Sequence, residues 1–281
     1  MKGCTECLIS VARLSNLHYY ADEEDIKVMQ MRNFITDDRL HRALDEVESW
    51  LDYKIKALPM PERHKQFATC GMGLCREAKE FKLWYIEGET QSQATYCHEL
   101  THIVQWINGN PSNCSIDSVP LGGNPNSPEW KAWNLVQHIP VWHLVKEMGF
   151  DESETQNEYM DNLIQTVSQG RLYTDAPLYL ITPLQAIALA SGLSRPATPE
   201  RHAHVRKVAA EKMPQSLELA EVITLGLKKY PQPTSQEFLG ALALLLNMIR
   251  MPTRNLKPSF LDKTCPNFHS RTLTAVNDAT P

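Results

Sequence analysis

The residues best suited to chemistry are His98, Glu99 and His102, which form the pattern His-Glu-x-x-His. The segment around them, residues 93–106, has the periodicity of a helix. Because residues four apart share a helix face, both imidazoles can bind one metal ion. Glu99 lies about 100° away around the helix, beside the metal, where a carboxylate can accept a proton from water. The spacing therefore predicts a zinc site with a general base next to it.

The predicted metal helix has two unlike faces and a defined end. Small and polar residues share the face of His98, which suits a cleft, and apolar residues such as Leu100 and Ile103 form the other face, which suits a core. Asn108 and Gly109 predict the end of the helix, because glycine adopts the left-handed conformation that caps helices.

A catalytic zinc ion needs a third protein ligand. The best candidate is Glu129, in the first turn of a helix predicted for residues 127–148, with a kink at Pro140 and a stop at Gly149. Glu129 lies on the apolar side of that helix, where a carboxylate needs a partner such as a metal ion. The alternative is an acidic residue that only favours the helix dipole. The other candidates for the third ligand are His138, His143 and Glu147.

Helices and two strands are predicted before the metal helix and a loop after it. Residues 22–33 and 37–57 have helical periodicity, and residues 67–75 and 81–86 are typical of a strand hairpin. The strand 81–86 is expected beside the metal helix with one edge open, because an open edge can bind a peptide by main-chain hydrogen bonds. The loop is predicted at residues 110–126.

The rest of the chain is predicted to be helical up to an irregular tail. Thr234 and Glu237 have the spacing of a capping box. Gly192 is expected to stop the helix that precedes Gly192 in the chain. Helices are predicted at residues 155–168, 183–191, 199–212, 214–228 and 235–251. The predicted fold class is α+β, with a zincin-like domain in residues 1–150, a helical region in 151–252 and a tail in 253–281.

The composition argues for a globular protein of the cytoplasm. A hydrophobic fraction of 42% with 22% charged residues can form a core, and a net charge of −5 gives no footprint for nucleic acid. No segment is apolar for long enough to be a signal peptide or to span a membrane. The odd number of cysteines, 7, is typical of a reducing compartment. Cys4 and Cys7, with Cys70 and Cys75, are expected to be free thiols, the alternative being a second zinc site.

These residues carry a resemblance to a known family. A strand, the helix with His98-Glu99-Leu-Thr-His102, a loop and a helix that opens with Glu129-x-x-Ala132 resemble the gluzincin group of zinc metallopeptidases, and within it the ImmA/IrrE-like peptidase domain. The resemblance covers about residues 65–150. It implies that His98, His102 and Glu129 hold zinc and that Glu99 is the general base.

The function predicted from the sequence is zinc-dependent hydrolysis of an amide bond in a protein or peptide. Glu99 would take a proton from water and pass it to the leaving amine. A further donor should stabilise the oxyanion, and the candidates are His138, His143 and Tyr159. Two alternatives stay open. One is a regulatory or partner-binding protein with a structural or relic zinc site, and the other is a zinc hydrolase of a small molecule.

Overall fold

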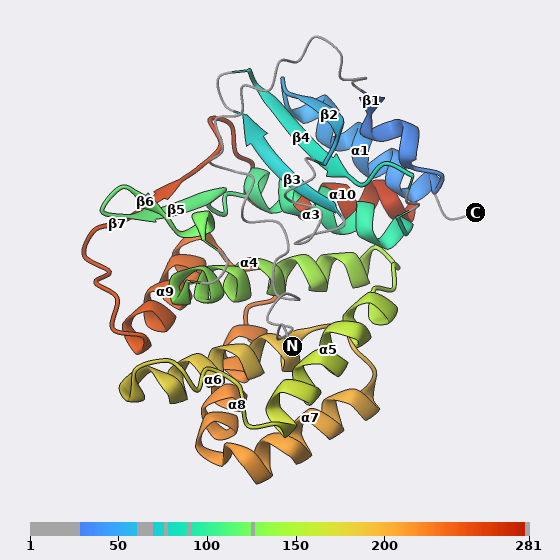
Figure 1. The fold of residues 1–281 in the computed structure, drawn as a ribbon. Coiled ribbons are helices and arrows are strands. Elements are labelled where there is room, and N and C mark those ends of the chain that lie inside the picture. Colours follow the sequence, from blue (N-terminus) through green and yellow to red (C-terminus); the bar gives the residue numbers. More distant parts are fainter. Residues whose placement is uncertain (1–28, 61–69, 76–77, 89–90, 125–126, 279–281) are drawn as a thin grey trace. The chain divides into compact units, whose positions relative to one another are not determined.

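The computed structural model describes most of the chain and divides it into two compact units by their internal contacts. The described residues are 29–60, 70–75, 78–88, 91–124 and 127–278. The first unit comprises Met1–Pro125, Leu144–Phe150 and Lys257–Pro281, and the second comprises Asn126–His143 and Asp151–Leu256. The fold class is α+β, as predicted, with mainly helices, a four-stranded mixed sheet and a three-stranded sheet (Figure 1).

The larger sheet belongs to the first unit. Its strand order is β1 (Met29–Gln30), β2 (Lys54–Pro59), β4 (Glu80–Tyr85) and β3 (Cys70–Cys75). β2 and β4 run parallel, and the other neighbours run antiparallel. Alternate residues of β4 are buried, as expected of a strand with one face on a core. The two strands predicted before the metal helix are therefore confirmed as β3 and β4.

The prediction of an open edge on the strand 81–86 is wrong. β4 lies inside the sheet, with β2 on one side and β3 on the other. The extra strand is β2, residues 54–59, of which 54–57 had been assigned to a helix. In the order of the described strands, β1 and β3 lie at the two edges, and β3 contacts helix α3 (Gln93–Ile107).

Of the two helices predicted first in the chain, the second is shorter than expected, and the described part of the first is not an α-helix. α1 covers only Asp38–Trp50, because β2 takes up the later residues. Residues 29–34 form β1 and a short 3-10 helix, η2 (Met31–Phe34), and the earlier part of that predicted helix lies outside the described residues. Ile55 and Ala57, two residues apart, fit a strand, whereas Ile55 and Leu58, three apart, fit a helix. A partner strand decides between them, and β4 supplies it.

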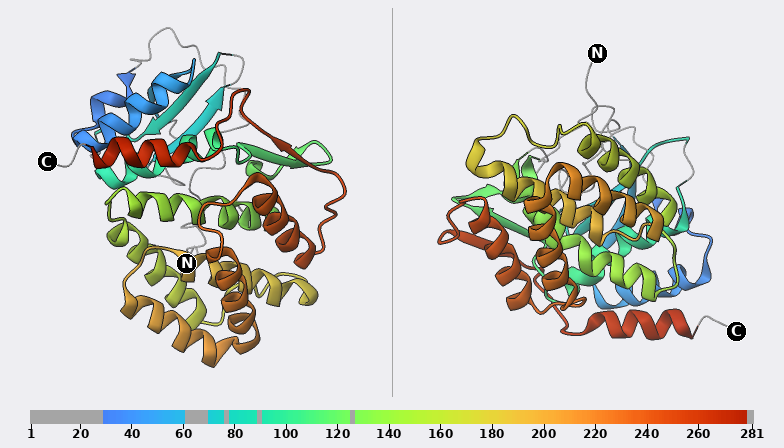
Figure 2. Two further views of the ribbon diagram at one scale, coloured as in Figure 1. Left: turned by 180° about the vertical axis from the view of Figure 1, so that it is seen from behind. Right: turned by 90° about the horizontal axis from the view of Figure 1, so that it is seen from below.

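The tail is not irregular throughout, which corrects a second prediction. Residues Phe268–Asn277 form α10, which contacts α1 and α3 and buries Phe268, Thr272 and Val276. Figure 2 shows α10, in red, beside α1, in blue. The rings of Trp50 and Phe268 lie 5.8 Å apart between their centroids. This end of the chain is part of the core of the first unit.

The loop predicted at residues 110–126 contains a hairpin. β5 (Asn113–Ile116) and β6 (Val119–Pro120) are joined by Asp117 and Ser118, whose φ angles are 50° and 69°. Two positive φ angles between paired strands are typical of a tight hairpin turn. β7 (Leu256–Ser259) adds the third strand from the tail, and η3 (Leu121–Gly123) follows β6.

Helix α4 (Pro128–Glu147) contains residues of both units, and the second unit is otherwise a set of helices. The predicted bounds of α7 and α8 are confirmed, and so is the capping box of Thr234 and Glu237 at the start of α9. The helices after α4 are α5 (Ser153–Ser168), α6 (Leu178–Ser194), α7 (Pro199–Lys212), α8 (Pro214–Lys228) and α9 (Ser235–Met248).

Four of these helices form two hairpins stacked in parallel. Thr198 at the start of α7 donates its backbone N–H to Asn157 of α5, and Arg201 binds Asp161 one turn later. Ser216 of α8 donates to Gln185 of α6, and Lys228 donates to the carbonyl of Leu193. Each pair of contacts advances in the same direction along both helices, so α5 runs parallel to α7 and α6 parallel to α8.

Gly192 was predicted to stop α6, but it does not. The helix continues to Ser194, and a Cβ atom at Gly192 would lie 2.4 Å from Cδ2 of Leu163. Glycine is therefore required here for the close approach of α5 and α6.

Two further predictions can be followed in part of the chain. Cys4, Cys7 and the side chain of Cys70 lie outside the described residues, and Cys75 is the last residue of β3. Among the described helices, none combines the length and the apolar character needed to cross a membrane.

Candidate metal centre

Helix α3 is fixed at both ends and buried along its length. The side chain of Ser92 accepts a hydrogen bond from the backbone N–H of Thr95, which caps the first turn. Gly109, with a φ of 102°, follows the last turn, as predicted. Every residue from Tyr96 to Ile107 is buried. The face that was expected to line a cleft is therefore enclosed.

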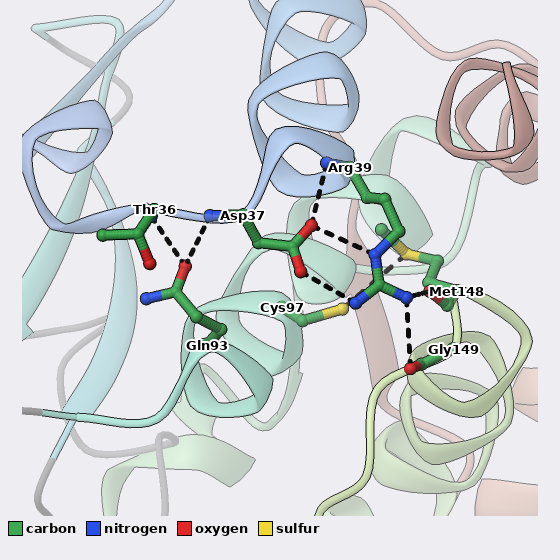
Figure 3. A network of polar contacts seen from close by, with 7 residues as sticks. All are labelled: Thr36, Asp37, Arg39, Gln93, Cys97, Met148 and Gly149. Carbon is green, nitrogen blue, oxygen red and sulfur yellow. Dashed lines mark hydrogen bonds and ion pairs between the residues drawn. The ribbon is translucent and has the colours of Figure 1, made fainter. Parts of the chain in front are cut away.

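A network of polar contacts joins the start of α3 to α1 (Figure 3). Oε1 of Gln93 accepts hydrogen bonds from the backbone N–H groups of Thr36, at 2.9 Å, and Asp37, at 3.3 Å. Nε2 of Gln93 donates to the carbonyl of Phe34. Cys97, next to His98, contacts Met148 with 3.8 Å between their sulfur atoms. The histidine motif therefore starts from an anchored turn.

The same network reaches the end of α4 through Arg39 (Figure 3). The guanidinium of Arg39 donates to Asp37 and to the carbonyl oxygens of Met148 and Gly149. Its hydrogen bond lowers the pKa of the Asp37 carboxyl, and Asp37 raises the pKa of Arg39. Carbonyls at a helix end have no partner inside the helix. Arg39 satisfies two such groups.

Three buried histidines form the only group of metal-ligating side chains found among the described residues. Ligand atoms of His98, His102 and His138 all lie within 4.8 Å of one another. The rings of His98 and His102 are 5.0 Å apart between centroids, as expected for positions one turn apart on α3. Their exposed fractions are 6%, 0% and 2% in chain order. Such a group can hold a metal ion.

The orientation of His138 suits a metal ligand. Its Nδ1 lies 2.8 Å from the carbonyl oxygen of Asn134. A carbonyl only accepts hydrogen bonds, so Nδ1 carries the proton and, in the neutral ring, Nε2 carries the lone pair. A metal-binding histidine is usually held in this way by a bond from its other nitrogen. Three neutral imidazoles are a known ligand set for catalytic zinc and leave a fourth position open.

Glu129, the predicted third ligand, is not in this group. Nine residues separate Glu129 from His138, which is a rise of about 13.5 Å and half a turn in direction along a helix. The two side chains leave opposite faces of α4, so they cannot bind the same ion. The structure thus supports one of the alternatives, His138. Glu147, another alternative, is exposed on the last turn of α4.

Glu99, the predicted general base, is buried next to His98 on α3. Its side chain is 2% exposed and follows His98 directly on α3, but its carboxylate is not part of the histidine group. A carboxylate beside a metal rather than on it remains able to accept a proton. This placement agrees with the predicted role and does not test it.

The three candidates for oxyanion stabilisation differ in their position relative to the histidine group. His138 is a member of the histidine group, and His143 lies five residues further along α4, about 140° around the helix. Tyr159 lies on α5 with the guanidinium of Arg195 over its ring, 3.6 Å from the centroid. Neither His143 nor Tyr159 belongs to the histidine group.

Two residues that sequence reasoning did not interpret lie on the His138 face of α4. Asn134, one turn before His138, is 5% exposed. Lys131 lies a further turn back, with its ammonium 5.3 Å from the ring centroid of Tyr173, and burial lowers its pKa to about 8. The helical period places both residues beside His138. It does not tell which face of α4 is buried against a site.

Comparisons of the chain with protein-family models, with curated proteins and with solved structures found no match. The resemblance to the gluzincins therefore stays a prediction from the sequence.

Proposed function

We propose that this protein is a zinc-dependent peptidase. The observation that carries the proposal is the histidine group, in which His98, His102 and His138 bring buried ligand atoms within 4.8 Å of one another. Glu99 is adjacent to it in sequence and buried. Nitrogen ligands of this kind favour zinc among the metals that hydrolytic enzymes use. The ligand set in this proposal is therefore three histidines, with Glu129 replaced by His138.

The chemistry needs few residues. A zinc ion at these histidines would act as a Lewis acid and lower the pKa of water towards 7. Glu99 accepts the proton of the attacking water and returns it to the leaving amine of the amide bond. Burial of the whole group excludes bulk water, which strengthens the electrostatic effect of each charged or polar side chain on the reacting atoms.

A peptide substrate fits the strand order of the first unit. An extended peptide can extend a sheet through main-chain hydrogen bonds when it meets an unpaired edge. β4 has no such edge, but β3 is at the edge of the sheet among the described strands and contacts α3. The proposed binding strand is therefore β3.

Metal analysis tests the proposal directly. Protein purified without added metal should contain one zinc ion per chain, measured by elemental analysis. The double variant His98→Ala, His102→Ala should contain none, because a single remaining imidazole cannot hold the ion. A screen of peptide libraries for cleavage products by mass spectrometry, with the double variant as the blank, should then find zinc-dependent cleavage.

The results separate the alternatives. Zinc at full occupancy in the double variant would place the metal elsewhere and overturn the proposal. Zinc lost in the double variant, with no peptide cleaved but small amides or esters hydrolysed, would favour a small-molecule hydrolase. Zinc lost with no hydrolysis of any kind would favour a structural metal in a partner-binding protein.

A further inference from the structure

The side-chain amide of Asn134 is a buried polar group in the second unit. It is 5% exposed, and its Nδ2 atom has no hydrogen-bond partner among the described residues. A buried N–H donor that is left without an acceptor costs about 1–3 kcal/mol of stability. Native proteins keep few such groups, and each one calls for an explanation such as a role in binding or catalysis.

The position of this donor relates it to the histidine group. Asn134 and His138 are four residues apart on α4 and so project from the same face, one turn apart. The backbone carbonyl of Asn134 accepts the hydrogen bond from Nδ1 of His138 at 2.8 Å. The residue that orients the third histidine therefore also presents an unused donor on the same face.

The donor is of the type that stabilises negative charge. A neutral amide N–H can bind the carbonyl oxygen of a substrate, and the bond strengthens as that oxygen becomes an oxyanion. His138 cannot supply this donor if it binds the metal through Nε2, because its Nδ1–H already donates a hydrogen bond to the backbone carbonyl of Asn134. On this face of α4, Asn134 lies one turn before His138 and Trp142 lies one turn after it.

We propose that Nδ2 of Asn134 donates a hydrogen bond to the carbonyl oxygen of the substrate and stabilises the oxyanion during amide hydrolysis. The inference rests on the proposed function. It assigns the role for which sequence reasoning had considered His138, His143 and Tyr159. It also accounts for the cost of the unpaired donor, since preorganised donors are kept free of internal partners for the transition state.

The test uses Asn134→Leu, which keeps the branched shape and removes the donor, with Asn134→Ala as a second variant in case the first does not fold. Acetohydroxamate serves as the probe with a carbonyl oxygen, and imidazole as a metal ligand without one. Binding of both to the zinc-loaded protein is measured by calorimetry. We expect the acetohydroxamate affinity to fall about tenfold with the imidazole affinity unchanged. The kcat for a cleaved peptide should fall about 10²–10³-fold, more than KM rises.

Thermal stability gives an independent readout. If Nδ2 is unpaired in the resting protein, Asn134→Leu should leave the melting temperature unchanged or raise it, because an unsatisfied donor is removed. Thr224→Val is the matched control: its hydroxyl on α8 is also buried and without a partner among the described residues. This variant should behave in the same way in melting and leave acetohydroxamate binding unchanged.

The outcomes distinguish the inference from the function on which it rests. Wild-type protein that binds neither zinc nor acetohydroxamate overturns both. Wild-type protein that binds both, with full acetohydroxamate affinity and kcat in the Asn134 variants, overturns only the role of Asn134. A variant that loses stability and metal together would show that the amide is structural, and this too overturns the inference.

Discussion

Helices α3 and α4 both contribute to the histidine group, but they hold their reactive side chains differently. In α3, His98, Glu99 and His102 fall within about one turn, and the helix is buried from Tyr96 to Ile107. In α4 the corresponding residues are spread along one face, with Lys131, Asn134 and His138 one turn apart from each other. A compact motif keeps its internal geometry however the helix is turned, whereas a spread-out face depends on the rotation of the helix about its axis.

This difference leads to different roles. α3 can combine metal binding and proton transfer because adjacent residues point about 100° apart. In the proposed function α4 would supply one ligand, and the residues a turn or more away would bind the substrate. Substitutions in α3 should therefore affect chemistry or metal content, while those in α4 should separate metal binding, substrate binding and stability.

The largest effect is expected for Glu99→Gln on α3. General acid–base catalysis is typically worth 10²–10⁴-fold, so kcat for a cleaved peptide should fall by about this factor. Zinc content and melting temperature should stay near the wild-type values, because Glu99 is not in the ligand group. Steady-state kinetics and elemental analysis on the same samples provide the measurement. Loss of zinc, or near wild-type turnover, would contradict the assignment of metal binding to the histidines and proton transfer to Glu99.

The next largest effect compares the two faces of α4. Structural zinc sites bind with about 10–16 kcal/mol over four ligands, so one ligand is worth about 3 kcal/mol or roughly 10²–10³-fold in affinity. His138→Ala should lower zinc affinity by this amount in competition with a fluorescent chelator. Glu129→Gln should have little effect, because Glu129 leaves the opposite face. The reverse result would restore Glu129 as ligand and would require α4 to be rotated by half a turn.

What the sequence could predict follows the same contrast. The histidine motif, the cap at Gly109 and the helix from Ser127 to Gly149 depend on neighbours within a few residues, and they were predicted. Which residue of α4 comes to lie beside His98 and His102 depends on the rotation of α4, and the apolar pattern did not settle this because the helix is apolar on most sides. The donor Asn134 was not recognised for the same reason.

The strands failed for a related reason. Residues 54–57 of β2 were assigned to a helix because its three buried apolar residues, Ile55, Ala57 and Leu58, include spacings of two and of three, and its partner β4 lies more than twenty residues away. The hairpin of β5 and β6 is extended by β7 from near the end of the chain. In the helical half, caps and prolines are local, and the bounds of α7 and α8 were correct.

A smaller effect tests how the end of α4 is held. Gly149 has a φ of 78°, and a Cβ atom there would lie 2.7 Å from Nη1 of Arg39, which binds the carbonyls of Met148 and Gly149. Gly149→Ala should lower the free energy of unfolding by about 2–3 kcal/mol, from the left-handed conformation and the disturbed hydrogen bonds. Gly170→Ala is matched, since Gly170 ends α5 with a φ of 63° and open space around it. It should cost only about 1–2 kcal/mol.

Urea denaturation of both alanine variants, with and without Arg39→Met, isolates the part of the lost free energy of unfolding that is due to Arg39. In the Arg39→Met background the two glycine substitutions should cost about the same, as a double-mutant cycle requires. Equal costs with Arg39 in place would mean that Arg39 moves aside freely. The end of α4 would then be held no more firmly than the end of α5.

The smallest effect concerns Lys131, at the start of α4. Burial lowers its pKa from the ordinary value of 10.5 to about 8, so at pH 7 the folded protein carries the cost of a desolvated charge. Lys131→Met should therefore raise the free energy of unfolding at pH 7 by about 1–2 kcal/mol, after allowance for the lost contact with the Tyr173 ring. Between pH 8 and about 10.5 the unfolded chain binds a proton that the folded chain has released, so this penalty disappears as the pH rises. The difference in stability between variant and wild type should narrow over that range in urea titrations.

Lys146→Met, at an exposed position in the last turn of the same helix, should show no such narrowing. A constant difference for Lys131→Met from pH 7 to 10.5 would mean that Lys131 keeps an ordinary pKa, and that the buried face of α4 does not extend to its first turns.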